Sequence, residues 1–352
     1  MVHLRHAKVI VGFVLGSILC ASSAWSQELP FREYRVDSEV NPLPSASISD
    51  VFRDRQGYMW FVVYSSGLVR YDGHTMEQYD TDEGLPSNLV TKAVEDGAGH
   101  LWVSTRKGLA ITEKPLADYG AGQRLSFTSK LGSAELASTD LKAESLAVDG
   151  QGALWVGLSG ALLRYAHEDG QLSIRRVELE PDAKGPPVAT VAVGVQRAGL
   201  VWVGMADGRL LTVNPDSGEV LEPAGWDAVK CPKLTEIFQE RGGSLLGGCV
   251  NGSVWQLDAE ARNLDSLRWR MEPNGSKVAN INQDNAGYIW VSARGSGFTR
   301  LGQNPDEPEL TRTRSNGLIS DGAEGVFEDP EGNLWFAQTG GVSKLRFNSR
   351  AF

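Results

Sequence analysis

The sequence predicts an all-β fold, a seven-bladed β-propeller, and two observations predict it. The first is a local motif in which an Asp-x-x-Gly turn, Asp96 to Gly99, leads into a short apolar strand anchored by Trp102. The second is that this motif recurs seven times, with anchors 42 to 53 residues apart. A period of about 40–45 residues is typical of propellers, in which each repeat forms one four-stranded sheet, or blade.

The residues of the motif have separate physical roles. The Asp accepts hydrogen bonds from following backbone N–H groups, and the Gly adopts a positive φ at little cost. The anchors are Trp60, Trp102, Trp155, Trp202, Leu246, Trp290 and Trp335. The turn Gly, three residues earlier, is Gly57, Gly99, Gly152, Gly199, Gly243, Gly287 and Gly332. The Asp position, six residues before the anchor, holds Asp54, Asp96, Asp149, Gln196, Glu240, Asp284 and Asp329.

Each repeat divides into strands a to d, bounded by these turns and by a second Gly after the anchor. Blades 1 to 3 are expected at 48–53, 58–63, 67–71 and 75–79; 89–95, 101–105, 108–112 and 124–128; and 144–148, 154–158, 162–165 and 173–179. Blades 4 to 7 are expected at 188–195, 201–205, 209–214 and near Val220; 235–240, 245–249 and 253–257; 278–283, 289–293, 298–301 and 310–314; and 325–328, 334–337 and 342–347.

The seventh repeat ends without a fourth strand, while the apolar-rich segment 31–36 precedes the first repeat without a blade of its own. Pairing this segment with the last blade would close the ring and protect its exposed edges. Residues 27–352 are therefore expected to form one seven-bladed domain.

The anchor Trp residues are expected to fill the space between neighbouring blades, because strand b reads as continuously apolar. In the fifth copy Leu246 takes the place of Trp, and Trp255 is expected to relieve the loss of volume. The Asp turns are not expected to bind calcium, because each supplies one regular carboxylate and calcium needs several oxygen ligands.

Residues 1–26 are expected to be a cleaved signal peptide. Arg5 and Lys8 form a basic head, 9–19 is an apolar run, and Ala24-Trp25-Ser26 favours cleavage before Gln27. The apolar run is short for a membrane span, which needs about 20 residues; an uncleaved anchor is the alternative. The Leu before Cys20 argues against lipoprotein processing. The mature protein is expected to be periplasmic, with no transmembrane helix.

Composition excludes some partners. The chain of 352 residues has 34 basic and 44 acidic side chains. Removing Arg5 and Lys8 with the signal peptide leaves 34 − 2 = 32 basic residues and a balance of 32 − 44 = −12. Without a Lys/Arg-rich run, a nucleic acid partner is not expected.

Two of the three cysteines, Cys231 and Cys249, remain after processing. In an exported protein this pair favours a disulfide, with two buried free thiols as the alternative. The blade assignment places both on the same face of the fifth blade.

The repeat resembles the two-component regulator propeller repeat. The resemblance depends on Glu83-Gly84-Leu85-Pro86-Ser87-Asn88, Val94-Glu95-Asp96 and Gly99-His100-Leu101-Trp102-Val103-Ser104-Thr105, and on the second linker Asn316-Gly317-Leu318-Ile319-Ser320-Asp321. It covers about residues 31–347; the third to fifth copies lack the Gly-Leu linker.

The resemblance implies an extracytoplasmic sensor domain for a small polar ligand, in some relatives a carbohydrate breakdown product. Relatives usually continue into a β-sandwich, a transmembrane helix and a kinase or cyclase module. This chain has none of these parts, so it is expected either to stand alone, with a membrane signalling protein as its partner, or to continue in a longer receptor.

The b-to-c loops and d-to-a linkers should open on one face, which varies in sequence as recognition surfaces do. We expect a polar site around the central channel on this face, formed by Tyr64, Asn88, Arg106, Arg294 and Gln338. An aromatic ring with amides and guanidinium groups suits a sugar or a small anion. The alternative is that these are solvated loop residues.

No enzymatic activity and no cofactor or metal is expected. His74, His100 and His167 lack metal-ligand spacing, and His100 is expected to be exposed. Asp82 and Glu83 with Asp207 or Asp321 are the candidates for a carboxylate pair in a glycosidase or lyase. A periplasmic protein-interaction scaffold is the other alternative function; it predicts a broad exposed apolar patch.

Overall fold

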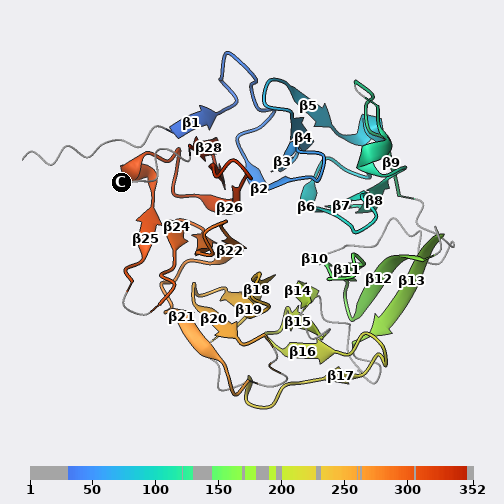
Figure 1. Ribbon diagram of the computed structural model, residues 1–352, viewed down its shortest axis with the longest axis vertical. Helices are drawn as coiled ribbons and strands as arrows, with labels where there is room; N and C mark the ends of the chain where they lie inside the picture. The colour runs from blue at the N-terminus through green and yellow to red at the C-terminus, as the bar shows by residue number, and fades with distance from the viewer. Residues whose placement is uncertain are drawn as a thin grey trace, which may run out of the picture.

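The computed structural model describes residues 31–120, 122–129, 145–168, 171–179, 190–195, 200–226, 231–259, 261, 264–304 and 307–346. The expected signal peptide, 1–26, lies outside these ranges. The described residues form seven four-stranded antiparallel sheets arranged around one axis (Figure 1). The all-β, seven-bladed propeller is therefore confirmed.

Within each blade the strands run in order from the inner strand a to the outer strand d. Blade 1 holds β2 (Ile48–Arg53), β3 (Met59–Val63), β4 (Gly67–Tyr71) and β5 (Met76–Tyr79). Blade 2 holds β6 (Val90–Glu95), β7 (Leu101–Thr105), β8 (Gly108–Thr112) and β9 (Phe127–Thr128). Blade 3 holds β10 (Ser145–Val148), β11 (Leu154–Gly157), β12 (Ala161–Glu168) and β13 (Gln171–Glu178).

The second half of the ring repeats this order. Blade 4 holds β14 (Thr190–Val195), β15 (Val201–Met205), β16 (Leu210–Val213) and β17 (Val220–Leu221). Blade 5 holds β18 (Leu234–Gln239), β19 (Leu245–Cys249), β20 (Val254–Leu257) and β21 (Arg268–Met271). Blade 6 holds β22 (Val278–Gln283), β23 (Ile289–Ala293), β24 (Gly297–Arg300) and β25 (Leu310–Arg312). Short 3₁₀ turns η1 (Thr81–Glu83), η2 (Leu116–Asp118) and η4 (Arg314–Asn316) lie between strands.

Blade 7 combines both ends of the chain. It holds β26 (Ala323–Glu328), β27 (Leu334–Gln338) and β28 (Gly341–Leu345), and its outer strand is β1 (Phe31–Tyr34). Phe31 pairs with Leu345 and Tyr34 with Val342, so the first strand closes the ring as expected. Figure 1 shows blue β1 beside red β28. Gly341 permits this closure, because a Cβ there would lie 2.1 Å from the Tyr34 carbonyl oxygen.

Seven separate apolar clusters fill the seven seams between neighbouring blades. In every blade the side chains of the described strand b are buried. Trp102, for example, packs with Leu146, Leu154 and Tyr165 of blade 3. The anchor Trp residues therefore fill the space between blades, as their pattern predicts.

The turn Asp does more than cap its turn. In each blade that has it, one carboxylate oxygen accepts a backbone N–H and the other accepts the indole N–H of the anchor Trp. The indole bonds are Trp60 to Asp54 at 2.7 Å, Trp102 to Asp96 at 2.7 Å, Trp155 to Asp149 at 3.0 Å, Trp290 to Asp284 at 2.9 Å and Trp335 to Asp329 at 2.8 Å. One side chain thus satisfies both the turn and the buried indole, which explains the six-residue spacing.

Blade 5 differs from expectation in two ways. It has a fourth strand, β21, that no pattern indicated, because a ten-residue connection separates it from β20 and no Gly-Leu linker follows it. Trp255 does not compensate for Leu246: Leu246 faces blade 6, whereas Trp255 packs towards blade 4 with Trp202 and Trp226.

Within the described ranges, no helix is long and apolar enough to cross a membrane.

Candidate functional site: the central channel

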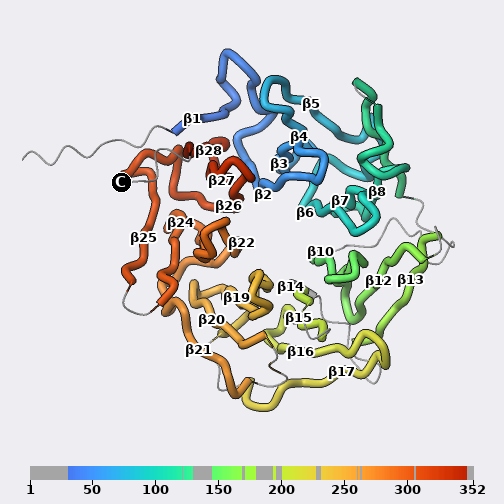
Figure 2. The backbone as a smooth tube through the Cα atoms, viewed as in Figure 1, coloured from blue at the N-terminus to red at the C-terminus, as the bar shows by residue number. Residues whose placement is uncertain are grey.

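The inner strands β2, β6, β10, β14, β18, β22 and β26 surround the ring axis, where Figure 2 shows them as the innermost segments of each blade. We call the end with the b-to-c loops and d-to-a linkers the loop face, and the end with the a-to-b turns the turn face. Six of these strands contain a β-bulge at their start. A bulge bends its strand and redirects the side chains beside it.

The position four residues before the turn Asp is occupied differently in each blade. In the six blades whose side chains the structure describes at this position, the residues are Asp50, Lys92, Ser145, Glu236, Asn280 and Gly325. The same backbone geometry therefore presents an acid, a base, a hydroxyl, an amide and a glycine. This variation at a structurally equivalent position is what a recognition site on a repeat protein requires.

One ion pair crosses the channel. The Lys92 Nζ atom of blade 2 lies 3.3 Å from Glu236 Oε1 of blade 5, and these blades are not neighbours in the ring. Glu236 raises the pKa of Lys92, against the effect of burial. The pair therefore keeps Lys92 charged and joins opposite sides of the channel.

Asp50 lies beside this pair. Its carboxylate accepts the Val51 N–H at 2.8 Å, and a Cβ at Gly325 would lie 2.9 Å from its Oδ1 atom. Burial raises the pKa of Asp50 to about 6, although Lys92 opposes the shift. The Oδ1 atom of Asn280 is buried and has no hydrogen-bond partner among the described residues.

The loop-face mouth of the channel is charged. Arg294, in the b-to-c loop of blade 6, lies 2.8 Å from Glu324, the bulge residue of β26. Burial raises the pKa of Glu324, and Arg294 opposes this shift. Burial, together with the charge of Arg294, lowers the pKa of Lys277. Two cations and one carboxylate from adjoining blades therefore meet at this mouth.

The five residues expected to form the ligand site have different environments. Tyr64 and Arg106 are exposed in b-to-c loops, and the Asn88 side chain accepts the Thr81 N–H at 3.0 Å within its linker. Arg294 is the member that contacts an inner-strand side chain. Among the described residues, no hydrogen bond or ion pair joins any two of the five.

Gln338 differs from the other four residues. Its side chain is 0 % exposed, and its Oε1 atom accepts the Ser320 N–H at 2.9 Å. It therefore supports the linker before blade 7 and does not line an open surface. Lys92, Glu236 and Asp50 were missed, because neither spacing nor composition shows which inner-strand positions meet across a ring.

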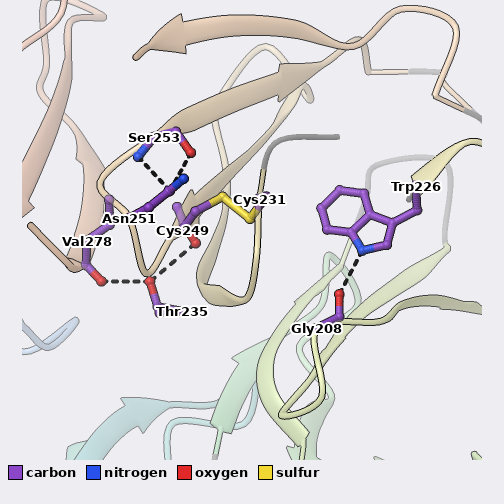
Figure 3. The surroundings of a disulfide bond; sticks show 9 residues. Gly208, Trp226, Cys231, Thr235, Cys249, Asn251, Ser253 and Val278 are labelled. Atoms are coloured by element: carbon purple, nitrogen blue, oxygen red, sulfur yellow. Dashed lines mark hydrogen bonds between the residues drawn. A yellow bond between two sulfur atoms is a disulfide. The ribbon is translucent and has the colours of Figure 1, made fainter. Parts of the chain in front are cut away.

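A disulfide joins Cys231 and Cys249 on the loop face of blade 5 (Figure 3). It ties the linker that enters β18 to the end of β19. The Thr235 hydroxyl continues this anchoring by donating to the carbonyl of Val278, at 2.7 Å, in the next blade (Figure 3). Glu236 follows directly, so the strand that supplies the channel carboxylate is held from both sides.

Two histidines that are distant in sequence come together at the seam between blades 2 and 3. The rings of His100 and His167 stack with centroids 4.9 Å apart, and His167 Nε2 lies 3.3 Å from Asp96 Oδ2. His100 is partly buried, contrary to expectation. No histidine of the described ranges lies on an inner strand, and no group of three metal-ligating side chains occurs among those residues.

The carboxylates considered for glycosidic chemistry are separate and locally engaged. Glu83 pairs with Arg124 at 2.6 Å, Asp207 with Arg209 at 2.7 Å, and Asp321 accepts the Arg314 N–H at 2.6 Å. Asp207 and Asp321 therefore stabilise their own loops, whereas Glu83 connects its linker to the segment before β9.

Comparisons with known proteins agree with this geometry. The sequence profile described as two component regulator propeller matches residues 84–107. No curated protein matches the chain significantly.

Three solved structures illustrate the fold. The extracellular domain of the putative hybrid two component system BT3049 from B. thetaiotaomicron is similar with a TM-score of 0.71 and 18% identity, over 90% of this chain and 41% of that domain. The corresponding domain of BT4673 has a TM-score of 0.66 and 17% identity, over 91% and 40%. Virginiamycin B lyase from Staphylococcus aureus has a TM-score of 0.65 and 12% identity, over 90% and 98%.

This chain thus spans about two fifths of the length of the two extracellular domains. The same ring occurs in extracellular domains of putative two component systems and in a lyase. The matched segment includes the Gly-Leu linker, the Asp turn and the anchor Trp of blade 2. The chain is therefore a seven-bladed propeller, and its residues 84–107 match the two component regulator propeller repeat.

Proposed function

We propose that this chain is an exported sensor propeller that binds a small polar ligand, such as an oligosaccharide, at the loop-face mouth of its channel. The observation that carries this proposal is the loop-face mouth itself, where Arg294, Glu324 and Lys277 meet. The exposed b-to-c loops that bear Tyr64 and Arg106 belong to the same face, in blades 1 and 2. These groups supply charged donors, an acceptor and an aromatic face, which suit hydroxyl-rich ligands.

Export of the chain by its N-terminal segment and transfer of the signal to a membrane protein belong to the same proposal. Its support is the likeness of the ring to extracellular domains of putative two component systems. Binding without catalysis is supported by the local engagement of the candidate carboxylates.

Thermal-shift screening against neutral oligosaccharides tests the proposal. A ligand present at 100 times its Kd should stabilise the folded state by about 2.7 kcal/mol. We expect the double variant R106A/R294A to lose the shift. R268A is a matched control, because Arg268 is 55% exposed and pairs with Asp258 on the outer rim, whereas Arg294 is 54% exposed and pairs with Glu324.

Retention of the full shift in R106A/R294A would overturn the loop-face assignment. Mass spectrometry of the oligosaccharide after incubation with the protein tests binding without catalysis. The oligosaccharide should be recovered intact. Cleavage products would instead favour the glycosidase or lyase alternative.

A further inference from the structure

A cavity lies at the turn-face end of the channel, opposite the loop-face mouth. Its volume is about 930 Å³, within the range of small-molecule sites. It is lined by the ends of the inner strands and by the a-to-b turns of blades 5, 6, 7 and 1, and we call it the turn-face cup. Its main side chains are Arg53, Gln56, Phe238, Arg241, Asn285 and Phe327.

Part of the cup wall is structural. Side chains that follow the turn Asp reach the next blade: Arg55 lies 3.3 Å from Glu95 and donates to the carbonyls of Asp96 and Gly97, and Arg241 donates to the Asp284 carbonyl. These contacts fix the turns relative to one another. The cup is therefore a preformed site, which reduces the entropy cost of binding.

Other donors remain available. The Nη1 atoms of Arg53 and Arg241 and the amide of Gln56 have no hydrogen-bond partner in the part of the chain that the structure describes. Arg53 has one carboxylate near it, Glu331, at 3.7 Å, and that side chain is largely exposed. Two guanidinium groups, from blades 1 and 5, thus line one cavity with unused donors.

The two acids that line the cup already accept hydrogen bonds from the chain, and three arginines line the same cup. Asp54 is buried, and its two oxygens accept Tyr58 N–H and Trp60 Nε1–H. Glu328 accepts the backbone N–H of Asn285. Since the whole chain carries a formal charge of −10, it repels anions in general, and an anion needs local arginines to bind here.

The cup also has an apolar wall. Phe238 and Phe327 are partly buried, and each packs against the apolar cluster of its seam while lining the cup. Guanidinium groups prefer carboxylates, with which they form charge-assisted hydrogen bonds, and phenyl rings prefer flat apolar faces.

We propose that the turn-face cup binds a small molecule in which a carboxylate is attached to a ring, either a uronic acid or an aromatic acid. Arg53 and Arg241 hold the carboxylate, and Phe238 and Phe327 contact the ring. This site is separate from the loop-face mouth and does not depend on the function proposed there.

Isothermal titration with D-glucuronate and with 4-hydroxybenzoate tests the inference, with D-glucose and phenol as neutral controls of similar size. We expect at least one acid to bind and its neutral counterpart not to bind. R53M should weaken binding about tenfold or more, because a charge-assisted hydrogen bond is lost. R300M is a matched control, since Arg300 is 27% exposed and Arg53 23%.

Arg53 also donates to the Gly57 carbonyl of its own turn, so Q56W provides a second variant that fills the cup without removing that bond. It should abolish binding while circular dichroism and the melting temperature stay unchanged. Binding of glucuronate alone would identify the acidic sugar, and binding of hydroxybenzoate alone the aromatic acid. The inference is overturned if neither acid binds, if the neutral compounds bind equally well, or if R106M on the loop face weakens binding and R53M does not.

Discussion

Blades 2 and 5 solve the same packing problem with different residues. In blade 2, Asp96 accepts the indole N–H of Trp102, and this Trp fills the seam towards blade 3. In blade 5 the corresponding acid is Glu240, which accepts the Gln256 amide at 2.9 Å, and the anchor is Leu246.

The aromatic volume of blade 5 has moved to its other seam. Trp255 lies over Gly247, where a Cβ would be 2.0 Å from the indole, and it packs towards blade 4. Its indole nitrogen is buried and lacks a partner within the described residues. Blade 5 adds the Cys231–Cys249 disulfide, which blade 2 lacks. The difference shows that the ring requires filled seams, whereas the residue that fills them can come from either strand b or strand c.

We expect the largest difference between blades 2 and 5 when the anchor residue of each blade is replaced by Ala. W102A should lower the free energy of unfolding by about 3–5 kcal/mol and L246A by about 2–4 kcal/mol, because a buried Trp leaves the larger cavity. Urea denaturation measures both. Equal losses would mean that the seam beside Leu246 depends on its anchor as much as the seam beside Trp102.

Removing the disulfide tests what stabilises blade 5. Closure of an 18-residue separation should contribute about 3 kcal/mol in the chain-entropy model, so C231A/C249A should lose about that amount. Urea denaturation of the wild type with and without dithiothreitol is the control: the reductant should destabilise the wild type and leave the variant unchanged. A variant that remains sensitive to the reductant would contradict this explanation.

Substitutions that give strands b and c of blade 5 the residues of a regular blade test whether Gly247 and Trp255 compensate for each other. G247V alone should cost about 1–3 kcal/mol through overpacking against Trp255. G247V/W255L recreates the pair found in blade 3, where Val156 is opposite Leu163, and should recover part of the loss. A double-mutant cycle by urea denaturation measures the coupling. Additive losses would show that Gly247 and Trp255 are not a compensating pair.

The smallest expected effect compares Asp50 and Glu236, which occupy the same position in blades 1 and 5. The pKa of Asp50 rises to about 6 on folding, so the folded state favours the neutral acid. The contribution of neutral Asp50 to the free energy of unfolding is therefore full at a pH below the ordinary pKa of Asp, and it is lost as the pH rises through about 6. D50N should therefore stabilise the protein by about 1–2 kcal/mol at pH 8 and have little effect near pH 4.

E236Q is the matched variant. It removes the charged partner of Lys92 and should destabilise the protein at pH 8, the opposite sign from D50N. Melting temperatures across this pH range measure both variants. Stabilisation by E236Q at pH 8 would show that the channel ion pair does not favour the fold.

The strands were predictable where the repeat is regular. In blade 2, the Asp96 turn, Gly99 and Trp102 are all local, and each has one conformational requirement. Strand β21 was not predictable, because no turn marks its start and its pairing with Trp255 depends on a distant partner.

The candidate sites were less predictable than the strands. Arg294 and Gln338 were both assigned to the site because each stands in or beside a variable loop. Sequence position does not distinguish a loop amide that faces solvent from one that accepts a buried backbone N–H.

The sequence by itself determined the seven repeats, the turn and anchor of each regular blade, and the closing role of the first strand, because these depend on short-range hydrogen bonding and on a regular apolar pattern. Only the tertiary structure decided that Lys92 meets Glu236 across the channel and that His100 stacks on His167. Such contacts join residues on separate blades, and their distances are set by the curvature of the closed ring.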